Sequence, residues 1–143
     1  MAKSSKIKMK LAPSEDWKDK YLRSVAELDN FRKRTTIEKA QIADNAKADI
    51  IAELLPIADS ILSAVNMNVE GIEPVYAQLQ EVFGKLGVQE IQAVDNEFNP
   101  NLHNAIMHIE DSSKVKNLCL EEFQKGYIMG DKVIRHSLVK VVN

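Results

Sequence analysis

The fold is decided by residues 14–55, which read SEDWKDKYLRSVAELDNFRKRTTIEKAQIADNAKADIIAELL. This stretch holds neither glycine nor proline, the two residues that most often interrupt regular structure. It opens with Ser14, Glu15 and Asp16, a hydroxyl and two carboxylates that suit the unpaired N–H groups and partial positive charge at the start of a helix. The sequence therefore predicts a long helix that begins near Ser14.

Candidate contact residues along this helix recur at the seven-residue step that is typical of a coiled coil. The expected contact positions are Tyr21, Leu28, Phe31, Thr35 and Ile42. Other positions of the seam are polar and the rest of the helix is strongly charged, so a single copy would bury too little surface to be stable alone. A solvated single helix is the alternative, but we expect residues 14–49 to pair with a second copy as a dimeric coiled coil.

The apolar pattern broadens in residues 50–87, which predict a helical hairpin. One stripe holds Ile50, Leu54, Ile57, Ile61 and Val65, and it is widened by Ile51, Leu55, Ala58 and Leu62. Dimer contacts are expected at Leu54, Ile57, Ile61, Val75 and Leu79. Because two short amphipathic helices cannot close a core by themselves, two copies of the hairpin are expected to form a four-helix bundle.

Two residues in this hairpin are expected to interrupt its helices. Pro56 lacks a backbone N–H and disfavours the helical conformation of the residue before it, so we expect a kink or a restart of the helix there. Gly71 falls in the turn between the two helices, where a glycine adopts the backbone conformations that other residues avoid.

Residues 88–143 consist of short runs of β-branched and aliphatic residues between turn-forming residues, and they predict a small β-domain. The expected strands are 88–94, 105–109, 115–123 and 133–142. Gly126, directly before Tyr127, predicts a close backbone approach or a positive φ. The fold class is therefore α+β, with residues 1–13 as a flexible N-terminal tail.

Composition narrows the possible functions. The chain has 143 residues with 19 Lys plus Arg and 21 Asp plus Glu, so its net charge of −2 gives no overall attraction to nucleic acid or to an anionic membrane. No apolar run reaches the ~20 residues that span a bilayer. Cys119 is the one cysteine, which excludes an intrachain disulfide and favours a reducing compartment. We expect no nucleic-acid partner, no membrane contact, no metal and no cofactor.

The motifs give no support to an enzyme. The sequence has no glycine-rich phosphate loop, no nucleophile elbow and no zinc-ligand spacing. His103 and His108 are five residues apart and would face opposite ways on a strand, and no cysteine or carboxylate pattern organises them or His136. We expect Cys119 to be an inert packing residue and the protein to lack catalytic activity.

Several short segments of the sequence together resemble the motifs of a known protein family. They are NFRKRT at 30–35, ELLPIAD at 53–59, FNPNLHNAI at 98–106, Gly126-Tyr127, and VIRHSLVKV at 133–141. In this order and spacing the chain resembles the GrpE family, the nucleotide exchange factors of DnaK-type heat-shock chaperones. The resemblance implies paired long helices, a four-helix bundle and two β-domains.

The resemblance also implies a function without catalysis. GrpE dimers bind the ATPase domain of one chaperone, press a β-domain against one lobe, open the nucleotide cleft and speed ADP release, in protein folding and in the heat-shock and hyperosmotic stress responses. The chaperone-binding residues that it implies are Lys33, Arg34, Gly71, Ile72, Met107 and Val141. It further implies a homodimer in the bacterial cytoplasm, with a mitochondrial matrix less favoured because the sequence starts with no convincing presequence.

Alternatives to these assignments stay open. Lys33 and Arg34 are also explained by a solvated helix face, Gly71 by the needs of a turn, and Val141 by sheet packing. A different function class is a coiled-coil dimeric tether or a weak nucleic-acid-binding adaptor without exchange activity. Acidic neighbours dilute the basic residues of the helix, and no series of aromatic residues accompanies them for base stacking.

Overall fold

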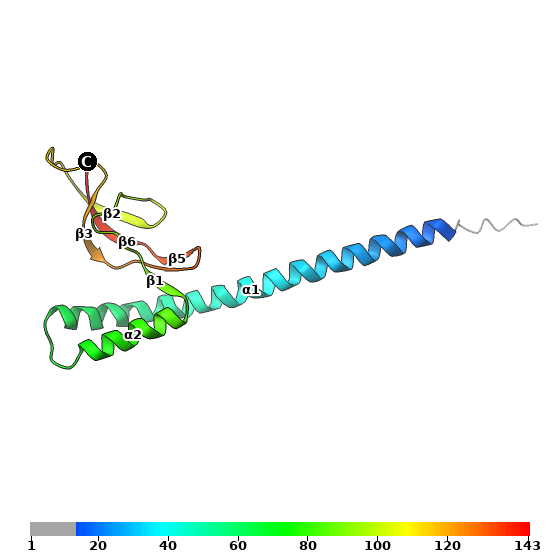
Figure 1. Ribbon diagram of the computed structural model, residues 1–143, viewed down its shortest axis with the longest axis horizontal. Helices are drawn as coiled ribbons and strands as arrows, with labels where there is room; N and C mark the ends of the chain where they lie inside the picture. Colours follow the sequence, from blue (N-terminus) through cyan, green and yellow to red (C-terminus); the bar gives the residue numbers. More distant parts are fainter. Residues whose placement is uncertain (1–13) are drawn as a thin grey trace, which may run out of the picture. The chain divides into compact units, whose positions relative to one another are not determined.

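A computed structural model describes residues 14–143, and the predicted N-terminal tail, residues 1–13, lies outside that range. The described chain consists of two helices followed by six strands, which confirms the α+β class (Figure 1). The described residues divide into two units, one that ends at Asp44 and one that comprises Asn45–Asn143. The long helix α1, Ser14–Asn66, begins where the sequence predicts and contributes to both units.

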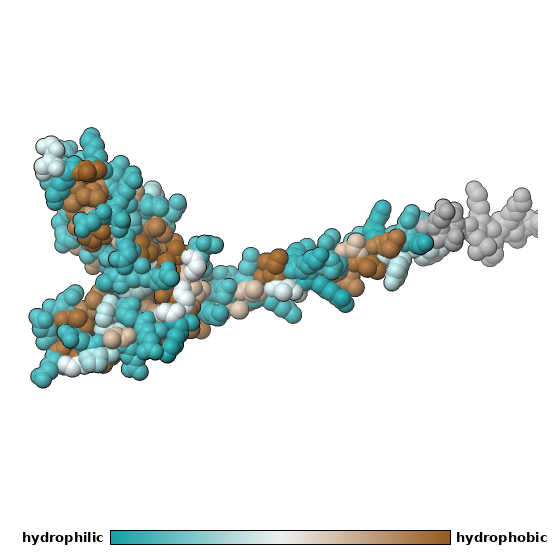
Figure 2. All heavy atoms as spheres, viewed as in Figure 1, coloured by the Kyte–Doolittle hydropathy of each residue, from teal (hydrophilic) through white to brown (hydrophobic). Residues whose placement is uncertain are grey.

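Within the first unit, large apolar side chains of α1 are exposed among charged ones (Figure 2). They include the predicted seam residues Tyr21, Leu28, Phe31 and Ile42, whereas Thr35 is half-buried. Charged neighbours pair along the helix, as in the contact of 2.8 Å between Lys20 Nζ and Asp16 Oδ2. A helix with this much apolar surface in water is typical of an element that packs against a partner.

The restart expected at Pro56 is not found, because α1 continues through this residue to Asn66. Leu55 and Ala58, on either side of the proline, are almost fully buried. Their packing offsets the hydrogen bond that the proline ring removes. The hydroxyl of Ser60 donates a hydrogen bond of 3.0 Å to the Pro56 carbonyl oxygen.

The two apolar stripes of residues 50–66, treated as one broad face in the sequence prediction, have different surroundings. Ile51, Leu55 and Ala58 are buried within their own chain. Ile50, Leu54 and Ile57 are exposed, and Ile61 is half-buried. The exposed residues therefore form a separate stripe beside the buried one.

The second helix, α2, spans Glu73–Lys85 and lies alongside the C-terminal part of α1 (Figure 1). Phe83 of α2 is buried in the same cluster as Leu55, and Leu79 packs against that cluster. Leu79, expected at a dimer contact, therefore contributes to the core of its own chain. Val75, expected at the same interface, is exposed.

The strands form two three-stranded sheets. The first sheet is antiparallel, with β4, Tyr127–Met129, between β1, Val88–Glu90, and β5, Lys132–Arg135. In the second sheet β6, Ser137–Val142, lies between β2, His103–Ile109, with which it is parallel, and β3, Cys119–Gln124, with which it is antiparallel.

The strand prediction needs three corrections. The expected strand 133–142 is divided at His136 into β5 and β6, which belong to different sheets. Residues 127–129, not predicted as a strand, form the centre of the first sheet. The expected strand 88–94 ends at Glu90, after which the chain passes toward the second sheet, where Ala93 is buried.

Each sheet has its own apolar core. In the first core, residues of α1 and α2 pack with Val88 and Tyr127, and the rings of Phe83 and Tyr127 meet edge to face with centroids 5.6 Å apart. In the second core, Ala93 and Cys119 pack with Val139 and Val141. Neither described helix is long and apolar enough to cross a membrane.

Candidate partner-binding surfaces

Lys33 and Arg34 lie on the exposed surface of α1 within the first unit. The Lys33 Nζ atom is 2.7 Å from Asp29 Oδ2, and the Arg34 Nε atom is 3.3 Å from Glu38 Oε1. These are pairs one helical turn apart between solvated side chains, which contribute about 0.3–0.5 kcal/mol each. Such weak pairs leave both cations able to exchange partners at little cost.

Gly71 and Ile72 lie in the turn between α1 and α2. Gly71 has a φ of +81°, which confirms the expected turn glycine, and a Cβ built on it would meet no atom within 4 Å. Asn68 also has a positive φ, of 55°. Ile72 immediately precedes α2, its side chain is half-buried, and its carbonyl oxygen accepts the first hydrogen bond of that helix from Tyr76. The backbone of Gly71 is therefore exposed, and no neighbouring side chain in the described chain covers it.

Met107 lies on the open face of the second sheet, which we define as the side that carries Met107, Glu121, Phe123 and Lys140. Met107 is 47% exposed and is the register partner of Lys140 on β6. The Lys140 Nζ atom is 2.6 Å from Glu121 Oε2 and lies 5.5 Å from the centre of the Phe123 ring. Phe123 and Lys140 were not predicted as contact residues, although the alternation in β6 places Lys140 on the other face of the strand from Val139 and Val141.

Val141, implied as a contact residue, is not accessible. Its side chain is 2% exposed and belongs to the core of the second sheet. Its backbone is paired on both sides, with His108 of β2 and with Cys119 of β3. A partner could reach its side chain only by opening the sheet, so the packing explanation applies to this residue.

A buried pair of a histidine and a cysteine was missed in the sequence. His103 Nδ1 lies 3.7 Å from Cys119 Sγ, and it also accepts a 3.0 Å hydrogen bond from the Asn99 backbone N–H. This contact places the ring proton on Nε2, a buried atom without a hydrogen-bond partner in the described chain. His103 closes the loop of the FNPNLH motif, because its own N–H donates to the Asn99 carbonyl oxygen at 2.8 Å.

The electrostatics of this pair oppose nucleophilic chemistry. Burial, with a smaller contribution from Glu122, raises the pKa of the Cys119 thiol, so its reactive thiolate is disfavoured. Burial and the nearby His136 lower the pKa of His103. Within residues 14–143 no group of three or more His, Cys, Asp or Glu residues is arranged to hold a metal ion.

Comparison with known proteins identifies the family. The GrpE family model matches residues 1–143. The chain is 48% identical over 132 residues to Protein GrpE of Clostridium beijerinckii, with 88% of this chain and 63% of the relative covered. It is 45% identical over 134 residues to Protein GrpE of Lachnoclostridium phytofermentans, with coverages of 87% and 60%.

A more distant relative gives the same result. Protein GrpE of Bacillus subtilis is 38% identical over 136 residues, which cover 89% of this chain and 73% of the relative. The chain thus spans less than two thirds of the length of the two clostridial relatives above. The motifs, the fold and the match over residues 1–143 agree, and the chain belongs to the GrpE family.

Proposed function

We propose that this protein is a co-chaperone that accelerates ADP release from a DnaK-type heat-shock chaperone in the bacterial cytoplasm, in protein folding and in heat-shock and hyperosmotic stress. Membership of the GrpE family over residues 1–143 is the observation that carries the proposal. The protein would change a binding equilibrium of its partner and form or break no covalent bond.

The accessible candidate residues support this role. Lys33 and Arg34 are solvated, Gly71 lies in an open turn, and Met107 is exposed beside Lys140. Ile72 is half-buried and offers part of its surface. Val141 would act indirectly, because it packs the sheet that carries Met107. In this proposal the open face of the second sheet presses on the ATPase domain.

Exchange requires differential binding. The protein must bind the open, nucleotide-free chaperone more tightly than the closed, ADP-bound one, because equal affinity for both would shift no population. By reciprocity, ADP weakens the complex by the same factor by which the complex weakens ADP binding. A sheet that presses against one lobe is suited to such selective binding, since it can make all of its contacts with the chaperone only when the nucleotide cleft is open.

We further propose that the active form is a homodimer. The exposed residues Tyr21, Leu28, Phe31 and Ile42 would line a coiled coil, together with the half-buried Thr35. The exposed stripe of Leu54 and Ile57, with Ile61 and Val75, would pack with the same residues of the second copy in a four-helix bundle. Leu79 would support this interface from within its own chain.

The test is stopped-flow release of a fluorescent ADP analogue from a DnaK-type chaperone, with and without this protein, together with its mass by light scattering. Faster release and a dimeric mass are expected. Unchanged release from a folded dimer, over several cognate chaperones, would reject the exchange function and favour a coiled-coil tether. Salt-dependent binding to DNA in the absence of a chaperone would favour the adaptor function instead.

A further inference from the structure

The two cores of the second unit share no residue among those described. The first core joins α1 and α2 to β1 and β4, through residues such as Leu55, Phe83 and Tyr127. The second core is built around Cys119 and Val139 of the other sheet. Apolar packing therefore fixes the first sheet on the helices, but no common core fixes the second sheet on α1.

Hydrogen bonds at Gly126 connect the two sheets where the chain passes between them. The Gly126 carbonyl oxygen accepts a hydrogen bond of 2.9 Å from the Ile91 N–H, and the Gly126 N–H donates one of 3.0 Å to Ser137 Oγ. Ile91 follows β1, Gly126 lies between β3 and β4, and Ser137 begins β6. All three connections between the sheets thus meet at this glycine.

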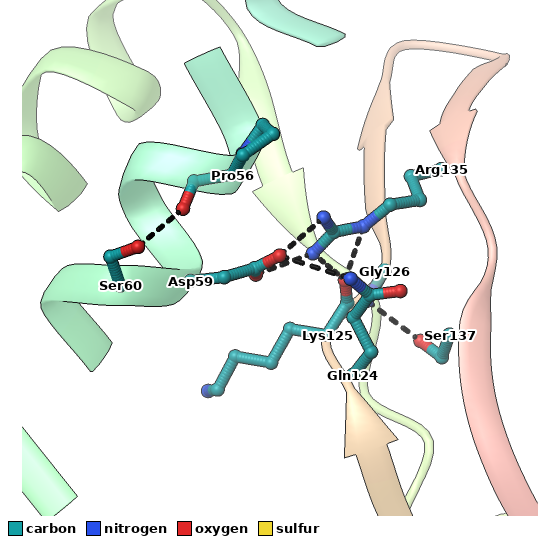
Figure 3. A network of polar contacts seen from close by, with 8 residues as sticks. All are labelled: Pro56, Asp59, Ser60, Gln124, Lys125, Gly126, Arg135 and Ser137. Atoms are coloured by element: carbon teal, nitrogen blue, oxygen red, sulfur yellow. Dashed lines mark hydrogen bonds and ion pairs between the residues drawn. The ribbon is translucent and has the colours of Figure 1, made fainter. Parts of the chain in front are cut away.

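One carboxylate of α1 binds donors from the ends of both sheets (Figure 3). Arg135, the last residue of β5, donates two hydrogen bonds of 2.7 Å to the two carboxylate oxygens of Asp59. Gln124, the last residue of β3, donates one of 3.0 Å to Asp59 Oδ2. Arg135 Nε also donates to the Lys125 carbonyl oxygen at 3.0 Å. Two-point pairs of this kind fix the mutual orientation of their partners as well as the distance between them.

These polar contacts matter because α1 and β3 are not closely packed beside them. A cavity of about 500 Å³ lies beside Asp59, lined by Leu62, Ser63 and Asn66 of α1 and by residues 122–125. Side chains of α1 and β3 therefore leave space between them at this point. Burial opposes ionisation of Asp59, but hydrogen bonds from Arg135 and Gln124 and the charge of Arg135 outweigh it and lower the pKa of this carboxyl group.

We infer that Asp59 sets the orientation of the second sheet relative to α1, with Arg135 and Gln124 as positioning residues. Asp59 is the point where the helix, the end of β5 and the end of β3 are bound together. When it is removed, the second sheet keeps its own core and turns about the connections at Gly126. The effect on a chaperone rests on the function proposed above, whereas the orientation of the sheet can be measured in this protein alone.

The first experiment measures the distance from α1 to β2 by pulsed electron paramagnetic resonance. Spin labels are attached at Glu53→Cys and Ile106→Cys, two exposed positions, in the full chain diluted with unlabelled protein so that intrachain distances dominate. Cys119 is fully buried and stays unlabelled. The parent protein should give a single narrow distance distribution.

Two variants and a control make this measurement decisive. Asp59→Asn removes the charge, and Gln124→Ala removes the one hydrogen bond from β3 while the pair of Arg135 and Asp59 remains. Both should broaden and shift the distribution, with unchanged circular dichroism. Glu81→Gln is the control, because it breaks an exposed ion pair of 2.7 Å with Lys85 inside α2. Distance distributions that match the control in both variants would overturn the inference. If Asp59→Asn fails to fold, the milder Gln124→Ala decides the test alone.

The second experiment uses the exchange assay. A misplaced sheet must first be brought into position, so Asp59→Asn should raise the half-saturating concentration about tenfold, which corresponds to ~1.4 kcal/mol, and leave the maximal rate unchanged. Altered distances with an unaltered exchange curve would overturn the part of the inference that concerns the chaperone. If the parent protein itself does not accelerate ADP release, the proposed function fails, and the distance measurement alone decides the role of Asp59.

Discussion

At Gly126 the backbone between β3 and β4 runs so close to β6 that no side chain fits. A Cβ at this position would lie 2.9 Å from the Arg135 carbonyl oxygen and closer still to the backbone nitrogen of Ser137. Backbone atoms held in two sheets cannot move aside cheaply. A residue without a side chain is therefore required where the chain passes between the two sheets.

Gly126→Ala should destabilise the protein by about 2 kcal/mol, the usual size of an overpacking effect. The measurement is urea unfolding followed by circular dichroism. Gly84→Ala is the matched control, since a Cβ there meets no atom within 4 Å and alanine favours a helix over glycine by up to ~1 kcal/mol. Equal stabilities of the Gly126→Ala variant and the parent protein would contradict the packing described here.

His103 makes the second sheet sensitive to acid. Its Nδ1 atom accepts the Asn99 N–H, so a proton on Nδ1 would break this contact inside the protein. Because burial and His136 lower the pKa of His103, the unfolded chain takes up the proton first. The stabilising contribution of neutral His103 is therefore complete above the unfolded value of about 6.5, and it is lost as the pH falls from there toward the lower folded value.

Unfolding free energies at about pH 7.5 and about pH 5.5 test this effect. The parent protein should lose stability at the lower pH, and His103→Gln should lose less because its amide has no such proton equilibrium. His108→Gln, at an exposed position of the same strand, should keep the full loss. A pH dependence that persists undiminished in His103→Gln would assign it to other groups.

Sequence reasoning succeeded for single residues where one local requirement dominates. Gly126 was predicted because a glycine between strands has few other uses, and Gly71 because the turn requires a positive φ. The burial of Val141 was left open, since both faces of β6 carry apolar and polar residues and only the packing of Ala93 and Phe98 on one side of the sheet shows which face is covered. The role of Asp59 could not be foreseen, because its partners lie 65 and 76 residues away in the sequence.

At the scale of elements, α1 presents two apolar stripes with different tasks. Ile51 and Leu55 face the core of their own chain, whereas Leu54 and Ile57 are exposed. The sequence shows both stripes but not their division, because this depends on where α2 and the first sheet pack. The continuity of α1 through Pro56 has the same cause, since burial of the neighbouring residues outweighs the lost hydrogen bond.

This division predicts opposite outcomes for neighbouring substitutions. Ile57→Lys should yield a folded monomer, because it places a charge in the proposed dimer interface and disturbs no buried residue. Leu55→Ala should keep the dimeric mass in the absence of denaturant and lose about 2–5 kcal/mol of stability through the cavity it leaves. Light scattering and urea unfolding distinguish the two, and a dimeric Ile57→Lys variant would exclude this stripe from the interface.

The division of the expected strand 133–142 was also beyond sequence reasoning. Alternation continues across His136 with the same parity, so the pattern resembles that of one long strand. The register shows two strands, with Arg135 paired to Tyr127 in the first sheet and Ser137 paired to His103 in the second. Only the contacts of each half reveal that the chain changes sheets at this residue.

At the scale of the whole molecule, the proposed function predicts that binding and folding can be separated at Gly71. Gly71→Asp places a charge and a side chain in the open turn and should weaken chaperone binding at least tenfold while the dimer persists. Gly87→Asp is the matched control, because Gly87 has nearly the same φ, +78°, and equally open surroundings. Both variants bear the same backbone strain, of the order of 1 kcal/mol.

Calorimetric titration with the chaperone and light scattering provide the readouts for Gly71. Equal loss of binding in both variants would mean that backbone strain alone is responsible. Dissociation of the Gly71→Asp dimer would assign the residue to the fold rather than to the contact.

The position of β6 between β2 and β3 has a consequence for the order in which the second sheet can fold. Both neighbours precede β6 in the chain, and neither is paired with the other. A folding chain in which β6 is not yet paired can close its helical hairpin through nearby residues, but its second sheet lacks the central strand. The edges of β2 and β3 that pair with β6 and the apolar residues around Cys119 are then exposed to solvent, a state prone to aggregation. A protein proposed to assist a chaperone thus contains a sheet that itself needs protection until β6 is in place.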